Sequence, residues 1–564
     1  MPSFVKRTVV GFVFAVFVLP LSASLRAQET QKSASAPPDV DMMWGVKIPT
    51  RDGIKLNATV FRPHQQKDPL PVIFTFTPYI GDSYTDRAVY FASHGFVYAL
   101  VDVRGRGNSE GEFEPFVNEG RDGYDVTEWL AKQPYSSGKV AMWGGSYAGF
   151  DQWTVLKEFP AHLATIVPAA AAHPGVDFPF QYNIFAPYNV QWLTFTSGHT
   201  GNSSTFGNDA FWGAKSRELY KSHAAFETYD TVVGNPLPVF QKWLQHPIPD
   251  AYYDAMVPSQ EQYAKISVPI LTITGHYDGD QPGAFTFYKR HMAYGIAEAK
   301  ANHYLIVGPW DHAGTRTPKK EMGGLKFADA SVLDLNNLHA EWYAWTMKSG
   351  AKPAFLKKRV AYYLMGADEW KYADSLETIA NGSLSLYLTS HGSAGDIFHS
   401  GSLLAEKSTG SPSDSWIYDP LDNRSGDAEP VENPSYLTNQ QGEVNLFGEG
   451  AIYHSEPFVA QTEVTGFVKL TLWLTMDVPD TDLDADLYEI LPDGTSIALT
   501  SATMRARYRN SLREAKLVPA GKPEQYVFDN FTFFSRRVEK GSRLRLVVHS
   551  LNSPGIEKNY NSGG

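Results

Sequence analysis

The most informative stretch of the 564-residue chain is Trp143-Gly144-Gly145-Ser146-Tyr147-Ala148-Gly149-Phe150. It approaches the G-x-S-x-G pattern of a nucleophile elbow, in which a serine stands on a sharp turn between a strand and a helix. Gly144 has the required place two residues before Ser146, whereas Gly149 follows three residues after it. The apolar run before this turn predicts a short buried strand, and the residues after it predict a helix. Ser146 is therefore a candidate nucleophile. A Gly/Ser turn without chemistry is the alternative on this segment alone.

Strand and helix patterns alternate on both sides of this turn. Apolar, β-branched runs are typical of buried parallel strands, and stripes of apolar residues at helical spacing separate them. The expected strands are residues 71–76, 96–103, 138–143, 270–274 and 303–307, and the expected helices are 85–94, 120–133, 151–157 and 335–348. This alternation predicts a parallel sheet with crossover helices, and hence the α/β class.

Two segments depart from this alternation. Residues 172–262 are rich in aromatic residues, Asn and Gly, and are expected to form a helical cap above the carboxyl edge of the sheet, where open α/β folds bind ligands. From residue 358 to 564 only strand patterns occur, the first at Val360 to Met365, which predicts an all-β domain of the jelly-roll type. The α/β domain is then expected in two parts, 40–171 and 263–357.

The first 27 residues have the three parts of a secretory signal peptide. Lys6 and Arg7 precede an apolar run from Thr8 to Leu21, and small residues follow as far as Ala27. The run is short for a bilayer span and no later segment is long enough, so no membrane span is expected after the signal is removed. We therefore expect a periplasmic or secreted protein.

Composition excludes several partners and chemistries. The chain has 49 basic and 61 acidic residues and a net charge of −12, and loss of residues 1–27 removes three basic and no acidic residues, which takes the charge to −15. Such an acidic chain argues against nucleic acid and anionic membranes as partners. The absence of cysteine rules out disulfides, thiolate metal sites and a cysteine nucleophile. A small-molecule ester, amide or short peptide is the expected partner, and homo-oligomerisation is left open.

Two loops can supply the groups that activate a serine. A serine hydroxyl needs a base to take its proton and a carboxylate to orient that base, and a parallel sheet of this type presents them in the chain order serine, acid, histidine. Asp278 follows the fourth expected strand and His312 follows the fifth. Because the carboxyl ends of parallel strands meet at one edge, both can converge on Ser146. Asp280 is an alternative acid in the same loop.

The oxyanion that forms during acyl transfer needs two hydrogen-bond donors. The amide after the nucleophile, that of Tyr147, is the first. The loop after the first strand reads Thr77-Pro78-Tyr79 and has no glycine-rich run of amides. The Tyr79 hydroxyl can serve as the second donor, and a tyrosine that packs against the cap is the equal alternative.

Two further patterns are weak. Gly105 and Gly107 have no third glycine at the spacing of a dinucleotide-binding loop. Alternate aspartates at 480, 482, 484 and 486 are reminiscent of a calcium loop, but Ala485 stands where an EF-hand requires glycine, and a solvated loop between strands is the preferred interpretation. We therefore expect no cofactor and no metal.

Several short motifs follow one another along the chain in the order found in a known hydrolase family. They are Thr77-Pro78-Tyr79, the run DVRGRGNSEG at 102–111, GSYAG at 145–149, GHYD at 275–278, GPWDH at 308–312 and Pro492-Asp493-Gly494. With these motifs the chain resembles the CocE/NonD hydrolase family, which includes cocaine esterase, α-amino acid ester hydrolases, glutaryl acylases and X-Pro dipeptidyl peptidases. The resemblance covers nearly all of the chain after residue 27. The family's serine lies in G-x-S-Y-x-G, which is the spacing around Ser146.

The resemblance implies a fold and a site. The fold is an α/β-hydrolase domain with a helical cap, followed by an all-β jelly-roll domain like the C-terminal domain of X-Pro dipeptidyl peptidases. Ser146 is then the nucleophile, with Asp278 and His312 as its partners. The Tyr79 hydroxyl and the Tyr147 amide would form the oxyanion hole.

Within the family the chain is most similar to the α-amino acid ester hydrolases, whose ending resembles residues 557–564. Those enzymes hold the substrate ammonium with one acid from the cap and two adjacent acids just after the catalytic aspartate. Here Asp177 and Asp280 correspond to the first two, but Gln281 stands in the third place. A missing carboxylate weakens the binding of a cation, which puts specificity for α-amino acyl groups in doubt.

The resulting hypothesis is a secreted serine hydrolase that cleaves an ester or amide through an acyl-enzyme, of the α-amino acid ester hydrolase or acylase kind. An X-Pro dipeptidyl peptidase and a general carboxylesterase are the alternatives within the class. From another class, the all-β domain allows a carbohydrate-binding protein with an inactive hydrolase domain.

Overall fold

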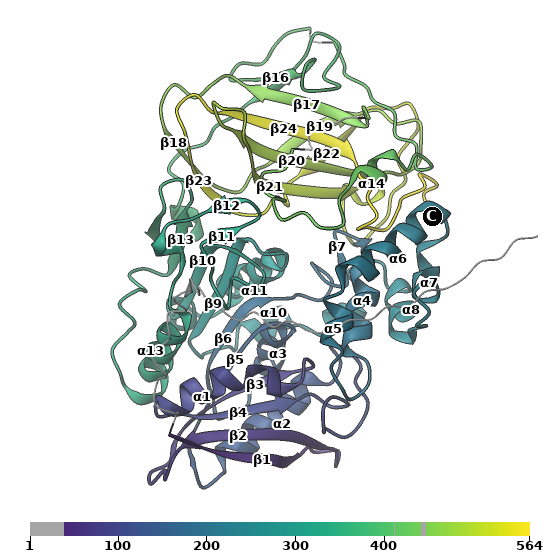
Figure 1. Ribbon diagram of the computed structural model, residues 1–564. Helices are drawn as coiled ribbons and strands as arrows, with labels where there is room; N and C mark the ends of the chain where they lie inside the picture. Colours follow the sequence, from purple (N-terminus) through teal and green to yellow (C-terminus); the bar gives the residue numbers. More distant parts are fainter. Residues whose placement is uncertain (1–38, 411, 441–446) are drawn as a thin grey trace, which may run out of the picture. The chain divides into compact units, whose positions relative to one another are not determined.

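A computed structural model describes residues 39–410, 412–440 and 447–564, and the chain from Val40 to Gly564 belongs to one unit (Figure 1). The expected signal peptide, residues 1–27, lies outside the described residues. Among the described residues, no helix has the length and apolar character needed to cross a membrane.

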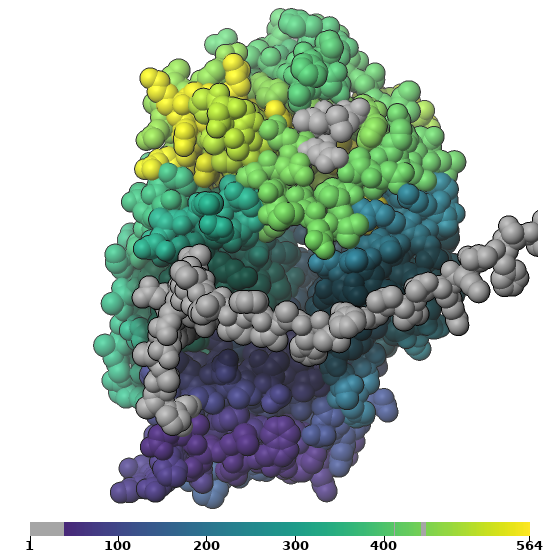
Figure 2. Space-filling model, viewed as in Figure 1, coloured from purple at the N-terminus to yellow at the C-terminus, as the bar shows by residue number. Residues whose placement is uncertain are grey.

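A ten-stranded sheet forms the centre of the first part of the chain, in the order β1-β2-β4-β3-β5-β6-β9-β10-β13-β14. The seven strands from β4 to β13 run parallel, and antiparallel strands stand at both edges. The α/β class expected from the sequence is thus confirmed. The edge hairpin of β1 and β2 lies at the surface (purple in Figures 1 and 2). The strands are β1 Val40–Pro49, β2 Lys55–Pro63, β3 Leu70–Thr77, β4 Val97–Asp102, β5 Ser136–Ser146, β6 Leu163–Ala171, β9 Ile270–Tyr277, β10 His303–Asp311, β13 Val360–Leu364 and β14 Glu369–Ala373.

Helices cover both faces of this sheet because its central strands are apolar on both sides. Phe74 of β3 packs in one core with Trp153 and Phe287, which come from α3 and α11, and the same core includes residues of α2. Ile73, the preceding residue of the strand, packs on the other face with Trp342 of α13 and with α1. The helices are α1 Thr85–Ser93, α2 Glu119–Ala131, α3 Tyr147–Leu156, α11 Gln281–Tyr294 and α13 Leu335–Lys348.

One strand belongs to a different sheet from the one expected. The segment Val360 to Met365 does form a strand, but as β13 it pairs in parallel with β10 and extends the ten-stranded sheet. In the sequence, the alternation of strand and helix ends before this segment. The segment also has the same apolar pattern as the strands that come after it. Pattern alone could not assign it to one sheet or the other.

The segment between β6 and β9 is mainly helical, as expected for residues 172–262. Its aromatic side chains, including Trp192 and Trp243, pack in the same core as α3 and the sheet, so these helices are continuous with the α/β part. The elements are β7 Phe180–Gln181, β8 Ile184–Phe185, α4 Tyr188–Thr196, α5 Ser203–Phe206, α6 Asp209–Ser222, α7 Tyr229–Val233, α8 Pro238–Leu244, α9 Ala251–Asp254 and α10 Gln260–Tyr263.

The last part of the chain is an all-β region around its own apolar core. It contains a six-stranded sheet in the order β15-β16-β17-β24-β20-β21 and the two-stranded sheets β18-β23 and β19-β22 (green to yellow in Figure 1). Its strands are β15 Tyr387–Thr389, β16 Gly401–Leu404, β17 Gly450–Ser455, β18 Thr462–Gly466, β19 Leu470–Leu474, β20 Asp482–Ile490, β21 Ser496–Arg505, β22 Glu524–Phe528, β23 Phe534–Val538 and β24 Arg543–Ser550.

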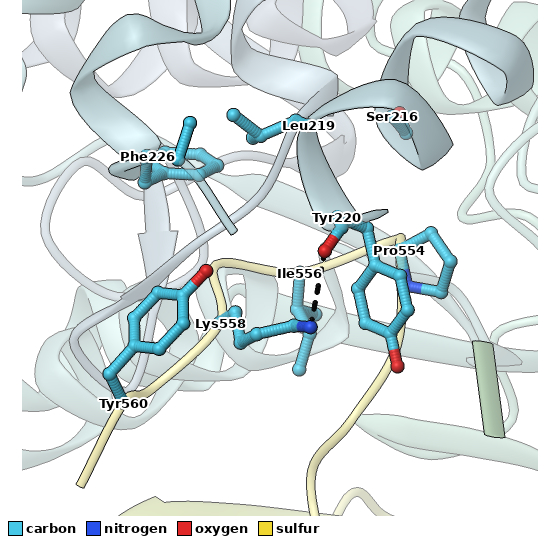
Figure 3. Close-up of a pocket in the computed structure, with 9 residues that line it drawn as sticks. Ser216, Leu219, Tyr220, Phe226, Pro554, Ile556, Lys558 and Tyr560 are labelled. Atoms are coloured by element: carbon cyan, nitrogen blue, oxygen red, sulfur yellow. Dashed lines mark hydrogen bonds between the residues drawn. The ribbon is translucent and has the colours of Figure 1, made fainter. Parts of the chain in front are cut away.

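The final residues connect the all-β region to the cap. Glu557 binds Arg505 of β21 at 3.1 Å, and its amide donates to the carbonyl of Phe185 at 2.9 Å. The Lys558 ammonium lies 3.6 Å from the ring centre of Tyr220 and donates to its carbonyl at 3.2 Å (Figure 3). The pocket along this seam has a volume of about 20 Å³, enough for one water and not for a substrate.

We expect Gly149→Ala to destabilise the fold. An added Cβ would lie 2.9 Å from the carbonyl oxygen of Ala169 and 2.9 Å from Cα of Ala171, which are backbone atoms that cannot turn away. Overpacking of this kind costs about 1–3 kcal/mol. Gly382→Ala is the matched control, because nothing lies within 4 Å of its Cβ position. A lower thermal midpoint for the first variant but not the second is expected, and equal midpoints would contradict the packing argument.

Candidate active site

Ser146 stands in a strained turn at the end of β5. Its backbone has φ 63° and ψ −125°, a region that residues other than glycine rarely occupy. A Cβ on Gly144 would lie 2.5 Å from Cβ of Ala148, and Gly149 packs directly on β6. The turn therefore requires small residues on the α3 side and on the β6 side. The unusual spacing of the second glycine results from this packing, because that glycine meets a neighbouring strand.

Tyr79 faces the candidate nucleophile from the loop after β3. Its hydroxyl lies 3.4 Å from Ser146 Oγ and accepts a hydrogen bond from Trp192 Nε1 at 3.1 Å. Burial raises the pKa of the Tyr79 hydroxyl above its usual value, so it keeps its proton. With its oxygen engaged by Trp192, that proton is available toward Ser146. The Tyr79 ring also stacks on Phe195 of the cap at 5.6 Å, so the tyrosine packs against the cap, and its role as an oxyanion donor stays a prediction.

Arg106 joins the Tyr79 loop to the cap. Its side chain is fully buried, and its Nε donates to the carbonyl of Pro78 at 2.7 Å. The other end of the guanidinium donates to carbonyls at the end of α4, those of Phe195, Ser197 and Gly198. A cation there satisfies the unpaired carbonyls of the helix terminus. The loop that carries Tyr79 is thus held by the same helix that supplies Trp192.

His312 and Asp278 form the expected pair at the ends of β10 and β9. His312 Nδ1 lies 2.9 Å from Asp278 Oδ1, and Asp278 accepts further hydrogen bonds from Thr274 Oγ1 at 2.8 Å and the Asp280 amide at 3.0 Å. The Asp278 side chain is wholly buried, whereas 38% of the His312 side chain is exposed. This bond places the imidazole proton on Nδ1 and leaves Nε2 free to act as a base.

Opposing effects act on the pKa of His312. Burial alone would lower its pKa, but the negative charges of Asp280 and Asp278 outweigh burial and raise the pKa above the usual value. Asp280 Oδ2 lies 3.7 Å from His312 Nδ1. Among the described residues, Ser146 Oγ has its hydrogen bond with Tyr79 and none with the His312 ring in this conformation. Such bonds commonly form fully only when substrate is bound.

The three positions compared with an ammonium-binding cluster have different roles here. Asp177 accepts backbone hydrogen bonds from His173 at 2.7 Å and from Gly283 at 2.6 Å, and burial raises its pKa to about 8. Gln281 is 1% exposed, and its side chain bonds to both the carbonyl and the amide of Phe533 in the all-β region. Of these three positions, only Asp280 has a carboxyl group directed toward His312.

Tyr147 takes the place expected for the oxyanion amide. It is the first residue of α3, so its N–H is one of the amides that have no partner within the helix. Its side chain points into the core, where the hydroxyl donates to Glu119 at 2.5 Å and accepts from the amide of Phe116 at 2.6 Å. These bonds fix the start of α3, and hence the direction of the amide.

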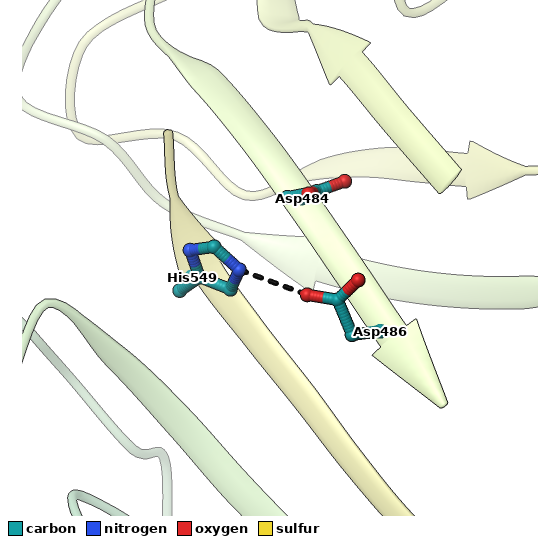
Figure 4. A group of neighbouring side chains, drawn as sticks. All are labelled: Asp484, Asp486 and His549. Atoms are coloured by element: carbon teal, nitrogen blue, oxygen red, sulfur yellow. Dashed lines mark hydrogen bonds and ion pairs between the residues drawn. The ribbon is translucent and has the colours of Figure 1, made fainter. Parts of the chain in front are cut away.

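The aspartates expected in a solvated loop lie instead mainly in β20, where alternate residues share one face. Asp482 binds Arg505 at 2.8 Å, and Asp486 binds His549 Nε2 at 3.0 Å (Figure 4). His549 Nδ1 lies 3.0 Å from the carbonyl of Ser550, and the pKa of His549 is raised to about 9, although burial opposes the effect of Asp486. With both ring nitrogens donating, the His549 imidazole is a cation that pairs with Asp486.

Sequence reasoning missed Arg106, Trp192 and Arg316. Arg106 stands in the Gly-rich run after β4, whose glycines direct attention to phosphate binding instead. Arg316 comes four residues after His312 and packs on Gly145, where a Cβ would lie 2.4 Å from its Cδ. Both lie in loops after parallel strands, and that location was the available signal. Trp192 lies in the cap, where no pattern marks it.

Fold and site define an α/β hydrolase with a serine at the nucleophile elbow, and comparison with known proteins gives its family. Residues 52–314 match the family model of X-Pro dipeptidyl-peptidase (S15 family), and residues 354–564 match the X-Pro dipeptidyl-peptidase C-terminal non-catalytic domain. The cocaine esterase of Rhodococcus sp. (strain MB1 Bresler) is 26% identical over 550 residues, 92% of each chain. These relatives are esterases and peptidases of the S15 hydrolase family, and the chain is a hydrolase with the two domains that the family models describe.

Solved structures support the fold. An α-amino acid ester hydrolase superposes with a TM-score of 0.79 at 20% identity, covering 96% of this chain and 94% of the other. An aminopeptidase from a marine sediment Thaumarchaeota archaeon gives a TM-score of 0.76, also at 20% identity, with the same coverage.

Asp280→Asn should move the acid limb of the kcat/KM–pH profile to lower pH. A base acts only when unprotonated, so activity rises with pH through the pKa of His312. Loss of the Asp280 charge removes part of what holds that pKa up. The exposed Asp86→Asn on α1 changes the net charge equally and should leave the profile in place. An unchanged or upward shift for Asp280→Asn would contradict this assignment.

Proposed function

We propose that the protein is a serine hydrolase that cleaves an ester or amide through an acyl-enzyme. Ser146 is the nucleophile, His312 the general base and acid, and Asp278 the group that orients His312. The observation that carries the proposal is the strained serine at the end of β5, with the Tyr79 hydroxyl 3.4 Å away and the His312–Asp278 pair at the ends of β10 and β9.

The reaction is derived from these positions. His312 Nε2 takes the Oγ proton as the oxygen attacks the substrate carbonyl, and Asp278 stabilises the imidazolium that forms. The Tyr79 hydroxyl and the Tyr147 amide donate to the oxyanion. His312 then protonates the leaving group as its bond to the acyl carbon breaks. A water molecule, deprotonated by His312, releases the acid and restores Ser146.

α-Amino acyl esters remain a candidate substrate. Asp280 would then face the substrate ammonium, and neither Asp177 nor Gln281 would add a free carboxylate. Asp177 is engaged by two backbone amides and Gln281 by the all-β region. The preference for substrates with an ammonium group should therefore be weaker than in a site with three free carboxylates. A general carboxylesterase and an X-Pro dipeptidyl peptidase are the other candidates. Comparing phenylglycine methyl ester, a plain acyl ester and an X-Pro anilide separates the three.

Export is part of the proposal. It is supported by the three-part pattern of residues 1–27, and N-terminal sequencing of protein from the periplasm or the medium would test it.

Ser146→Ala should abolish the hydrolysis of activated esters. It should also abolish labelling by a fluorophosphonate, which requires an activated serine. Wild-type protein that takes no label would instead favour a carbohydrate-binding protein with an inactive hydrolase domain. Turnover retained in Ser146→Ala would eliminate Ser146 as the nucleophile.

Tyr79→Phe should lower kcat by about 10²–10³, the usual effect of losing one oxyanion donor, with little change in KM. The substitution keeps the ring stacked on Phe195 and removes the hydroxyl that faces Ser146. Tyr90→Phe, on α1, is the matched control and should retain full kcat. A Tyr79→Phe variant with normal kcat would show that another group binds the oxyanion.

A further inference from the structure

Arg316 lies beside the candidate nucleophile. It ends the turn that begins at His312, and its Nη1 lies 2.5 Å from the position that a Cβ of Gly145 would occupy. Since consecutive Cα atoms are 3.8 Å apart, the guanidinium is at most about 8 Å from Cα of Ser146. Arg316 is half-buried, so part of its side chain is open to solvent.

The Arg316 guanidinium has no acidic partner. Within the described ranges of the chain, no carboxylate lies within 4 Å of it, and its hydrogen bond is a long one, 3.4 Å, to Thr315 Oγ1. Arg104, in the loop after β4, is by contrast neutralised by Asp122 at 2.6 Å. An uncompensated, partly desolvated guanidinium is unfavourable, and a bound anion would relieve it.

A second guanidinium increases the positive charge. Arg87 Nη2 donates to the carbonyl of Arg316 at 3.4 Å, and its head lies 3.6 Å from the ring centre of Trp143. Arg87 also has no ion pair among the described residues. Burial lowers its pKa to about 10, and the charge of Arg316 acts in the same direction.

The charge of Arg316 reaches groups from three sides of the candidate site. It acts on Asp280 and His312, which come after β9 and β10, and on Tyr188, which begins α4 in the cap. Asp280 is the acidic group in this set, and its oxygen is directed to the imidazole at 3.7 Å. The Arg316 guanidinium therefore lies within electrostatic reach of the groups that surround Ser146.

We propose that Arg316 binds a carboxylate carried by the substrate, close to the bond that is cleaved. The inference rests on the proposed serine hydrolase function and names its substrate class as esters or amides with an anionic group. Arginine suits this role because its planar fork donates two parallel hydrogen bonds to a carboxylate. The carboxylate can belong to the acyl group or to the leaving group.

Paired substrates separate these two sources. The 4-nitrophenyl half-ester of glutarate carries the charge on the acyl side, and its neutral match is the 4-nitrophenyl methyl diester. For the leaving-group side, 4-butyryloxybenzoate is compared with its methyl ester. We expect wild-type protein to have the higher kcat/KM for the anionic member of at least one pair. Arg316→Gln should lower the ratio of kcat/KM for the anionic substrate to kcat/KM for its neutral match roughly 10- to 100-fold.

Controls distinguish binding from a structural role. Arg121→Gln, exposed on α2, changes the net charge equally and should keep the wild-type ratio. Arg316→Lys keeps the charge without the fork and should give an intermediate ratio. The rate of fluorophosphonate labelling at Ser146 checks that each variant is folded and active.

Two results would overturn the inference while the proposed function stands. One is a wild type that hydrolyses neutral esters and has no preference for either anionic substrate. The other is an Arg316→Gln variant that loses activity equally on the neutral and anionic members of a pair. A wild type that neither hydrolyses the esters nor takes the label would show instead that the proposed function is wrong.

Discussion

The rest of the site depends on the close packing that holds Ser146 in a strained backbone. Gly144 lets α3 begin directly behind the serine, and Gly149 lets that helix lie on β6. A side chain at either position would move the start of α3 and with it the Tyr147 amide. The same turn leaves the other side of β5 open at Gly145, where Arg316 packs. One constraint thus brings together the candidate nucleophile, the Tyr147 amide and the Arg316 side chain.

The cap contributes to this arrangement through α4. Trp192 holds the Tyr79 hydroxyl, and Arg106 ties the backbone before Tyr79 to the end of the same helix. In a parallel sheet the loops that follow the strands otherwise vary in conformation and are more mobile than the strands. A buried guanidinium that satisfies four carbonyls makes this loop rigid. The cap is therefore a support for the candidate oxyanion hole as well as a wall of the site.

Much of this could be predicted from the sequence, because strand ends obey simple geometry. The α/β class was implied by the alternation of elements, and Asp278 and His312 lie in contact as their places after successive strands implied. The predictions that were wrong depend on contacts between segments that are distant in the sequence. Strand β13 has the same pattern whichever sheet it joins, and the aspartates of β20 find Arg505 and His549 only in the folded sheet. Nothing local distinguishes Asp177, engaged by backbone amides, from an acid free to bind a ligand.

Gln281 shows how the all-β region can limit the chemistry of a site it does not form. Its amide group donates to the carbonyls of Gly275 and Phe533 and accepts from the amide of Phe533. A carboxylate in its place would face two carbonyl oxygens with no proton to offer, which is strongly unfavourable when buried. A third acid could therefore stand here only if the all-β region were attached differently. Contacts with the all-β region thus favour a neutral side chain at position 281, next to Asp280.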